Sequence, residues 1–353
     1  MLYTLCNSLG PITLGYNIPE INQAIVEQLK NGIVFSYPHP LEGEVAKLLV
    51  EVIPCAEKVR FLKTGGEAIA ACIKIARYHT RRNKILHCGY NGWLNTLSAP
   101  AGPLPPGIAS SSPYNGVPPV LQALHKSLSW GNLEEWEKVF SKEGEEIAAV
   151  VIASDYAEME KGKEFLPAIR NLTQKYGTLM IMDEIVTGFR LAIGGAHQYF
   201  DFKPDMAVFG KGLANGMPVS AYLGRKDLLD SAPKITISST FGGETLSLAA
   251  AKASIKFYKK NNVIDYLWKT GEKIWNEVQN LFKKYNIEAD LKGFPVCPYF
   301  SFNSAEERDL FFKTCYKNGV SLYHVPYVNY SHKEKDIKET LERMERAIKE
   351  MKK

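Results

Sequence analysis

The sequence has few of the features that mark membrane, secreted or metal-binding proteins. Its 353 residues contain no run of about 18 or more apolar residues. The chain does not begin with a positively charged segment followed by an apolar one, as a signal peptide would. Its six cysteines form no C-x-x-C pair, and its histidines show no metal-ligand spacing. This pattern favours free thiols in a reducing compartment over disulfides or zinc. We therefore expect a cytoplasmic protein with no membrane span and no bound metal.

An excess of charge of one sign is also missing. The net charge is only +5, and no basic stretch is interleaved with aromatic residues, so a nucleic-acid partner is not expected. Apolar residues make up 45% of the chain and charged residues 23%. This composition is typical of a soluble globular protein with an ample core, either of two or three domains or of one large α/β unit with an appendage.

The middle of the chain alternates between apolar strands and amphipathic helices. Strands are expected at 148–154, 178–184 and 205–211, and helices at 44–53, 66–82 and 164–177. KVRFLKT, between the first two helices, reads as a short strand. Near-continuous apolar strands separated by helices predict a parallel sheet that is buried on both faces. Residues 219–225 follow the previous strand too closely for a helical crossover, so this strand is expected to be antiparallel.

The pattern changes after Gly243, where long amphipathic helices begin and shorter elements lead to a final charged helix. We predict an N-terminal segment at 1–35, a large α/β domain at 36–244 and a smaller α+β domain at 245–353. The Pro- and Ser-rich stretch 98–119 reads as a long loop that is either functional or disordered.

Polar signals follow three of the predicted strands, at the edge where ligands bind in an open parallel sheet. The first is Gly65-Gly66, between Thr64 and Glu67. Glycines let a ligand approach the backbone, and free N–H groups at a helix start favour an anion such as phosphate. The same residues also fit an ordinary capping box, which is the more frequent explanation of such a motif taken alone.

The second signal is Asp183-Glu184, and the third is Lys211. The acidic pair could bind a metal, transfer protons, neutralise a ligand cation or cap a turn. Gly212 stands where a Walker A loop needs Ser or Thr, so a nucleotide loop is disfavoured. A desolvated lysine loses its proton readily, and its neutral amine forms Schiff bases. A phosphate cradle, a carboxylate and such a lysine together are what pyridoxal phosphate (PLP) requires.

The segment 182–229, which runs from MDEIVTGFR to LGRKDLL, resembles the core of the class III PLP-dependent aminotransferases. It is most similar to the glutamate semialdehyde aminomutase branch and its sugar-aminotransferase relatives. LGPITLGYNIPEI, FLKTGGEA, CGYNGW, STFGGETLSLAAA and YSHKEKDIKETLERM follow the family's order. The resemblance implies a fold-type I transferase, with a mostly parallel seven-stranded sheet in the large domain, a smaller C-terminal α+β domain, and a homodimer.

The resemblance also implies roles at the reacting centre. Lys211 would hold the cofactor aldehyde as an aldimine and then move the substrate proton. Asp183 would pair with the ring nitrogen. Ile185 would pack on one face of the ring and Tyr90 on the other, with Trp93 as an outside candidate for the pocket.

Other residues are implied at the phosphate and the substrate. Gly65 and Gly66 would bind the phosphate through their N–H groups. Thr240 would reach the phosphate of the neighbouring subunit, unless it is an ordinary β-strand residue. Arg190 is a candidate partner for a substrate carboxylate or hydroxyl, with a structural ion pair as the alternative. The seven histidines are best explained as structural.

The chain departs from the family pattern at two places. Family members carry several dozen residues before the LGPITLGY segment, which help to cover the site, so a more exposed pocket is expected here. Relatives have Ser or Thr at the position of Gly66. The loss of that hydroxyl predicts weaker cofactor binding, by about 1.5–3 kcal/mol for a charge-assisted hydrogen bond.

The substrate is predicted from what the C-terminal segment lacks. LYHVPYVNYSH has no counterpart of the glutamate that aminomutases carry there, and CGYNGW resembles enzymes that aminate sugars. We therefore expect transfer of an amino group from glutamate to a keto or aldehyde sugar or sugar acid. A glutamate semialdehyde aminomutase and a non-catalytic protein of the same fold remain as alternatives. A Rossmann sugar-nucleotide binder is disfavoured, because no G-x-G-x-x-G follows the first strand.

Overall fold

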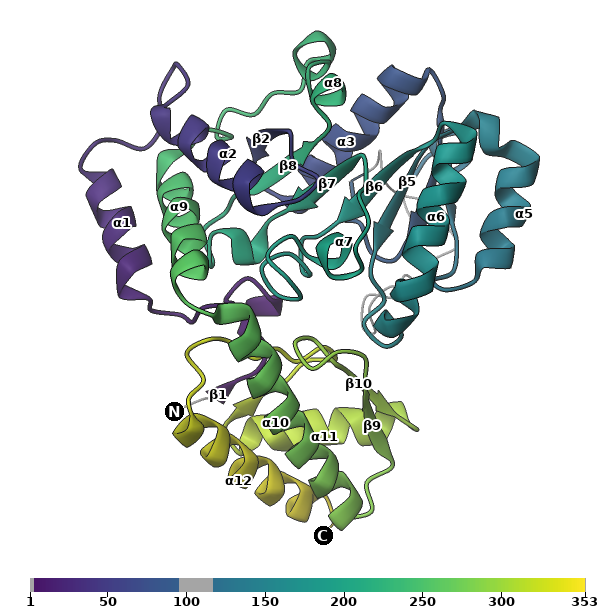
Figure 1. Cartoon of the computed structure of the whole chain (residues 1–353). Coiled ribbons are helices and arrows are strands. Elements are labelled where there is room, and N and C mark those ends of the chain that lie inside the picture. The colour runs from purple at the N-terminus through teal and green to yellow at the C-terminus, as the bar shows by residue number, and fades with distance from the viewer. Residues whose placement is uncertain (1–2, 95–116, 353) are drawn as a thin grey trace.

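A seven-stranded sheet forms the centre of the computed structural model, which describes residues 3–94 and 117–352 (Figure 1). Its strands, in spatial order, are β2 (Lys58–Leu62), β8 (Ser220–Gly224), β7 (Met206–Phe209), β6 (Leu179–Asp183), β5 (Ile147–Ala153), β3 (Lys84–Cys88) and β4 (His125–Ser127). Strand β8 is antiparallel to both neighbours, and all other pairs are parallel. The predicted fold class and the antiparallel strand at 219–225 are confirmed.

Helices bury this sheet on both faces. In β5 the side chains alternate, so that Val151 belongs to one hydrophobic cluster and Val150 to the other. Helix α3 (Gly65–Thr80) packs in the first cluster, while α6 (Gly162–Tyr176) and α5 (Leu133–Glu143) pack in the second. A strand that is apolar at every position is therefore required here, because both of its faces meet helices.

The N-terminal part of the chain contacts two regions. Helix α1 (Pro19–Leu29) and α2 (Pro40–Val52) lie against α9 (Thr245–Lys260) beside the large sheet (Figure 1). Strand β1 (Tyr3–Thr4) instead pairs in parallel with β11 (Val320–Ser321), near the C-terminus. The start of the chain therefore links the two halves of the molecule.

The C-terminal part forms a smaller layer beneath the large sheet in Figure 1. Helices α10 (Val263–Lys284), α11 (Ala305–Lys317) and α12 (Glu334–Met351) accompany the antiparallel pair of β9 (Ala289–Lys292) and β10 (Tyr299–Phe302). The division of the chain at residue 245 stays a prediction. Most of the loop predicted at 98–119 lies outside the described residues.

Three short helices complete this part of the chain: α4 (Pro119–Gln122), α7 (Ala196–Tyr199) and α8 (Lys226–Leu229). No helix within residues 3–94 and 117–352 is long and apolar enough to cross a membrane. All six cysteines carry free thiols.

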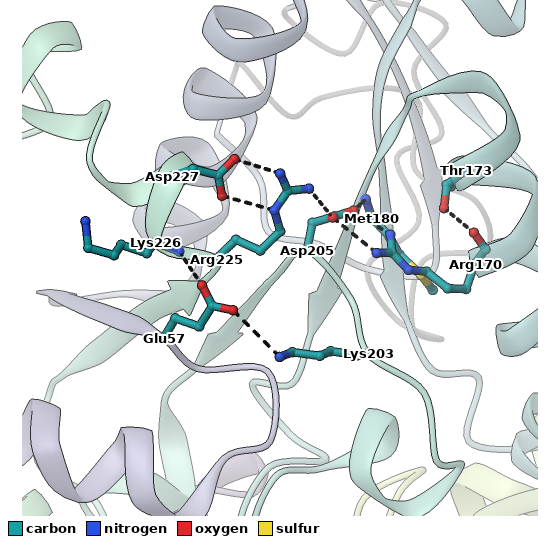
Figure 2. A network of polar contacts seen from close by, with 9 residues as sticks. All are labelled: Glu57, Arg170, Thr173, Met180, Lys203, Asp205, Arg225, Lys226 and Asp227. Carbon is teal, nitrogen blue, oxygen red and sulfur yellow. Dashed lines mark hydrogen bonds and ion pairs between the residues drawn. The ribbon is translucent and has the colours of Figure 1, made fainter.

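A buried carboxylate holds the amino ends of the central strands together (Figure 2). Asp205, just before β7, accepts hydrogen bonds from the N–H of Met180 in β6 at 2.8 Å and from Arg170 in α6 at 2.6 and 3.2 Å. Arg225, after β8, donates to it at 2.9 Å. This cluster fixes three strands and one helix at the edge of the sheet opposite to Asp183.

Candidate active site

The three polar signals of the sequence lie along one edge of the sheet. Strand β6 ends at Asp183, and β7, its parallel neighbour, ends two residues before Lys211. Strand β2 is antiparallel to β8, as β7 is, so β2 runs parallel to β7 and its carboxyl end lies at the same edge. A two-residue turn, Lys63-Thr64, follows β2 and leads into Gly65 and Gly66, the first residues of α3. The hydroxyl of Ser220 in β8 ties this turn to the sheet by donating to the carbonyl of Thr64 at 2.8 Å.

Lys211 begins a short 3₁₀ helix, η4 (Lys211–Leu213), with a φ of 42°, a left-handed conformation that is strained for a lysine. The N-terminal segment covers it, since a Cβ on Gly10 would lie 3.7 Å from the lysine Cδ. Asn215 secures this segment through the N–H of Leu14 and the carbonyl of Gly15, each at 2.9 Å. Burial lowers the pKa of the Lys211 amine to about 8; Asp183 opposes this shift.

Asp183 is 91% buried, and burial raises the pKa of its carboxyl group to about 6. Its Oδ1 accepts the N–H of Ile185 at 3.1 Å, and its Oδ2 accepts the Asn91 amide at 3.5 Å. Tyr90 is half-exposed, and the pKa of its phenol is raised by burial and by the nearby Asp183. Lys211 and Asp183 are close enough to shift each other's pKa, although no ion pair within 4.0 Å joins them in the described structure.

The start of α3 combines both roles that the sequence allowed for it. Thr64 and Glu67 form the capping box, with the Thr64 hydroxyl accepting the Glu67 N–H at 3.3 Å. The N–H groups of Gly65 and Gly66 have no protein acceptor in the described structure. A Cβ on Gly65 would lie 2.8 Å from the Cδ1 atom of Ile185, so a larger residue here would have to displace the Ile185 side chain. Two donors at a helix start thus remain for an anion.

Trp93 and Thr240 lie where the chain is open to solvent. Trp93 is 77% exposed, and Thr240 is exposed in the loop before α9. That loop is anchored to the end of β2, because a Cβ on Gly242 would touch the Phe61 carbonyl and Glu244 pairs with Lys63 at 2.9 Å.

Arg190 is fully buried, and the substrate contact expected for it stays a prediction. Its guanidinium donates to the carbonyls of Val296 and Val328 at 3.2 and 3.1 Å, and to that of Gly10 at 3.1 Å. It also stacks on the Tyr327 ring at 4.6 Å. The alternative of a structural ion pair is not found, since no carboxylate in the described structure lies within 4.0 Å of Arg190. Arg190 instead joins the N-terminal segment to the C-terminal layer beside Lys211.

Asn91 and two histidines near the site were not singled out from the sequence. His87 in β3 contacts Asn91 at 3.3 Å and His125 in β4 at 2.8 Å. The histidines were interpreted as structural because no metal spacing links them. The four-residue spacing of His87 and Asn91 across a strand end is a weak signal. The pairing with His125 depends on the neighbouring strands.

Comparison with known proteins gives a family match over nearly the whole chain. The model of the family "Aminotransferase class-III" matches residues 1–348. A 3-aminobutyryl-CoA aminotransferase from Cloacimonas acidaminovorans is 30% identical over 99% of this chain and 84% of its own length. A glutamate-1-semialdehyde 2,1-aminomutase from Lachnoclostridium phytofermentans is 33% identical over 97% of this chain and 86% of its own.

A solved structure shares the fold at lower identity. An omega-transaminase from Sphaerobacter thermophilus superposes with a TM-score of 0.87 and 21% identity, over 99% of this chain and 87% of that one.

Proposed function

The chain belongs to the class III aminotransferases, PLP-dependent enzymes of fold type I, and we propose that it transfers an amino group from glutamate to a keto or aldehyde sugar or sugar acid. The observation that carries the proposal is the buried Lys211 amine, with its pKa lowered to about 8, at the same sheet edge as the buried carboxylate of Asp183. A lysine with a lowered pKa supplies a neutral amine near neutral pH, which carbonyl chemistry needs.

The residues at this edge fit PLP. The N–H groups of Gly65 and Gly66, which have no acceptor among the described residues, would bind its phosphate, Asp183 its ring nitrogen and Lys211 its aldehyde. When bound, PLP supplies an electron sink for cleavage of a bond at the substrate's amine-bearing carbon. The Ile185 side chain lies between Gly65 and Gly210, where it would support one ring face, and Tyr90 would support the other.

Lys211 and Asp183 then have separate tasks. The Lys211 Nζ would accept the proton of the substrate carbon and return it, because its pKa lies close to neutral pH. Asp183 would remain the anionic partner of the ring nitrogen, held by the Ile185 N–H. The segment at 10–15 would exclude water from Lys211 by lying over it.

The amino acceptor is inferred from the segment 322–332. This segment reaches the surroundings of Lys211, since Tyr327 lies 3.5 Å from the position of a Gly10 Cβ. It has no acidic residue that could bind the amine of an intermediate while an amino group moves within a single small molecule. This absence favours a transferase with separate donor and acceptor. The identity to an aminomutase favours glutamate semialdehyde isomerisation as the second candidate.

The visible absorption spectrum with PLP tests the proposal. We expect a band that requires Lys211, that is unchanged in Lys163→Ala on the exposed face of α6, and that collapses when glutamate alone is added. A band that ignores glutamate while the protein turns over glutamate semialdehyde would establish the second candidate instead. Absence of any band in the native protein would refute both enzymatic assignments.

We further propose that the site is completed by Thr240 of a second copy. Thr240 is exposed, and the Lys63–Glu244 pair fixes its loop, so the Thr240 hydroxyl is available for contact with a second copy of the chain. Co-expression of Lys211→Ala with Thr240→Glu tests this, since each variant alone should be inactive. A mixed dimer would contain one intact site and recover up to about half the native activity per mixed dimer. No recovery despite mixed-dimer formation would place Thr240 in the site of its own subunit, and full activity of Thr240→Glu alone would place Thr240 outside the site.

A further inference from the structure

A continuous line of hydrogen-bonding side chains runs from the protein surface to Asp183. Arg77, near the end of α3, contacts His125 Nε2 at 3.2 Å, and His125 Nδ1 contacts His87 Nε2 at 2.8 Å. His87 Nδ1 contacts the Asn91 Oδ1 at 3.3 Å, and the Asn91 amide nitrogen donates to Asp183 Oδ2 at 3.5 Å. The two imidazole planes lie within 16° of each other, which suits an N–H to nitrogen bond in the plane of the rings.

The direction of every bond in this line follows from its outer end. A guanidinium can only donate, so His125 Nε2 accepts and carries no proton. A neutral His125 must then carry its proton on Nδ1 and donate to His87. His87 in turn accepts at Nε2 and donates from Nδ1 to the Asn91 oxygen. The Asn91 NH₂ group is thereby turned toward Asp183. A carboxylate accepts only, so the inner end requires the same direction independently.

The environment supports neutral histidines. His87 and His125 are 97% and 93% buried, and burial lowers the pKa of His87 to about 3 and that of His125 to about 4. Arg77 forms no ion pair with a carboxylate in the described structure; its Nε donates to the Asn83 carbonyl at 3.0 Å. The positive charge at the outer end is therefore not neutralised locally, and it polarises the bonds inward.

We propose a directional relay that consists of Arg77, His125, His87 and Asn91. The relay fixes the orientation of the Asn91 amide and thereby favours the anionic form of Asp183. The four side chains are positioning residues, because they act through Asp183. The inference rests on the proposed function only for the use made of Asp183. The orientation of the relay is a property of the cofactor-free protein and does not depend on the proposed function.

The relay counteracts the burial of Asp183. Burial favours the protonated acid, whereas an N–H donor favours the anion. A hydrogen bond to a charged group is stronger than one between neutral groups, but the 3.5 Å contact between Asn91 and Asp183 is long, so a modest effect is expected. Loss of the Asn91 donor is expected to raise the proton affinity of Asp183 about tenfold, since about 1.4 kcal/mol is a factor of ten. More of the protein would then hold a neutral acid that cannot neutralise a ring cation.

Nitrogen-15 NMR of the imidazole groups in the cofactor-free protein tests the direction. We expect His87 and His125 to be neutral, protonated on Nδ1, and unchanged between about pH 5 and about pH 8. A proton on Nε2 of either ring, or protonation of either ring within this range, would overturn the relay. This measurement needs no PLP. A protein that shows the expected tautomers but binds no PLP would therefore contradict only the proposed function and not the relay.

Variants test the effect on Asp183, which is followed by the carboxyl carbon-13 titration of the cofactor-free protein. Asn91→Leu should raise the proton affinity of Asp183 about tenfold. Arg77→Met should raise it less, while Arg77→Lys, which keeps a charged donor, should restore part of the loss. His324→Phe removes a half-buried histidine outside the relay and should leave the titration unchanged. An unchanged titration in folded Asn91→Leu would refute the proposal.

Discussion

Replacement of Lys211 by methionine is expected to make the cofactor-free protein more stable at pH 7. Burial lowers the pKa of the Lys211 amine to about 8, from 10.5 for an ordinary lysine. At about 1.36 kcal/mol for each tenfold change in proton affinity, burying the ammonium costs about 3 kcal/mol. Solvent reaches part of the side chain and screens its charge, which reduces the expected cost to about 2 kcal/mol. Methionine keeps the apolar stem and the strained backbone, and it removes only the charge.

The sign of the pH dependence separates this explanation from better packing of methionine. Below pH 8 the lysine is protonated in both the folded and the unfolded chain, so the full cost is present. Between pH 8 and 10.5 the unfolded chain binds more protons, and the native protein therefore gains stability as pH rises. The advantage of Lys211→Met should shrink across this interval and vanish above it.

Urea unfolding at a fixed protein concentration, repeated from pH 7 to about pH 10.5, measures this advantage. Lys163→Met, at an exposed position of α6, is the matched control and should change the free energy of unfolding by less than about 0.5 kcal/mol at every pH. A destabilised Lys211→Met at pH 7, or an advantage that does not depend on pH, would refute the burial cost as its origin.

Two further predictions concern the frame of the site. Asp205→Asn should lower the free energy of unfolding by about 3 kcal/mol in urea, because it leaves the mostly buried Arg170 guanidinium without its anion and removes the buried partner of the part-exposed Arg225, whereas Asp227→Asn, at an exposed carboxylate, should cost less than about 1 kcal/mol. Equal losses would contradict the role of the buried cluster. Gly65→Ala should weaken PLP binding at least tenfold in a spectroscopic titration, because the new methyl group would lie 2.8 Å from Ile185, whereas Gly43→Ala has nothing within 4 Å and should bind normally; equal affinity would show that the turn adapts.

Much of the fold could be predicted because its signals are local. The strand at 148–154 is apolar at nearly every position, and only a sheet that is buried on both faces requires this. The short spacing to 219–225 was enough to predict the antiparallel strand. The resemblance to a family supplied the number of strands, which the periodicity alone did not give. The pairing of β1 with β11 was not foreseen, because two residues carry no periodicity and their partner lies more than 300 positions away.

The candidate site could be predicted where each residue follows its own strand. Asp183, Lys211 and the glycine turn are of this kind, since parallel strands deliver their ends to one edge. Arg190 shows the limit: its charge suggested a substrate contact, but three carbonyl groups from distant segments surround it. His125 was missed for the same reason. Its partner depends on the lateral order of β3 and β4, which no local pattern encodes.

The pKa values of the two central groups of the site, Asp183 and Lys211, are shifted toward each other and toward neutral pH. Burial raises the pKa of Asp183 to about 6 and lowers that of Lys211 to about 8. At pH 7 each group is within about tenfold of equal populations of its two forms, so adding or removing a proton at either one costs only about 1.4 kcal/mol. The same burial disfavours both charges in the folded protein, and the φ of 42° at Lys211 adds strain. A stabilising substitution at either position would thus remove the proton-transfer capacity that the burial creates, which is why stability and activity are expected to oppose each other at this edge of the sheet.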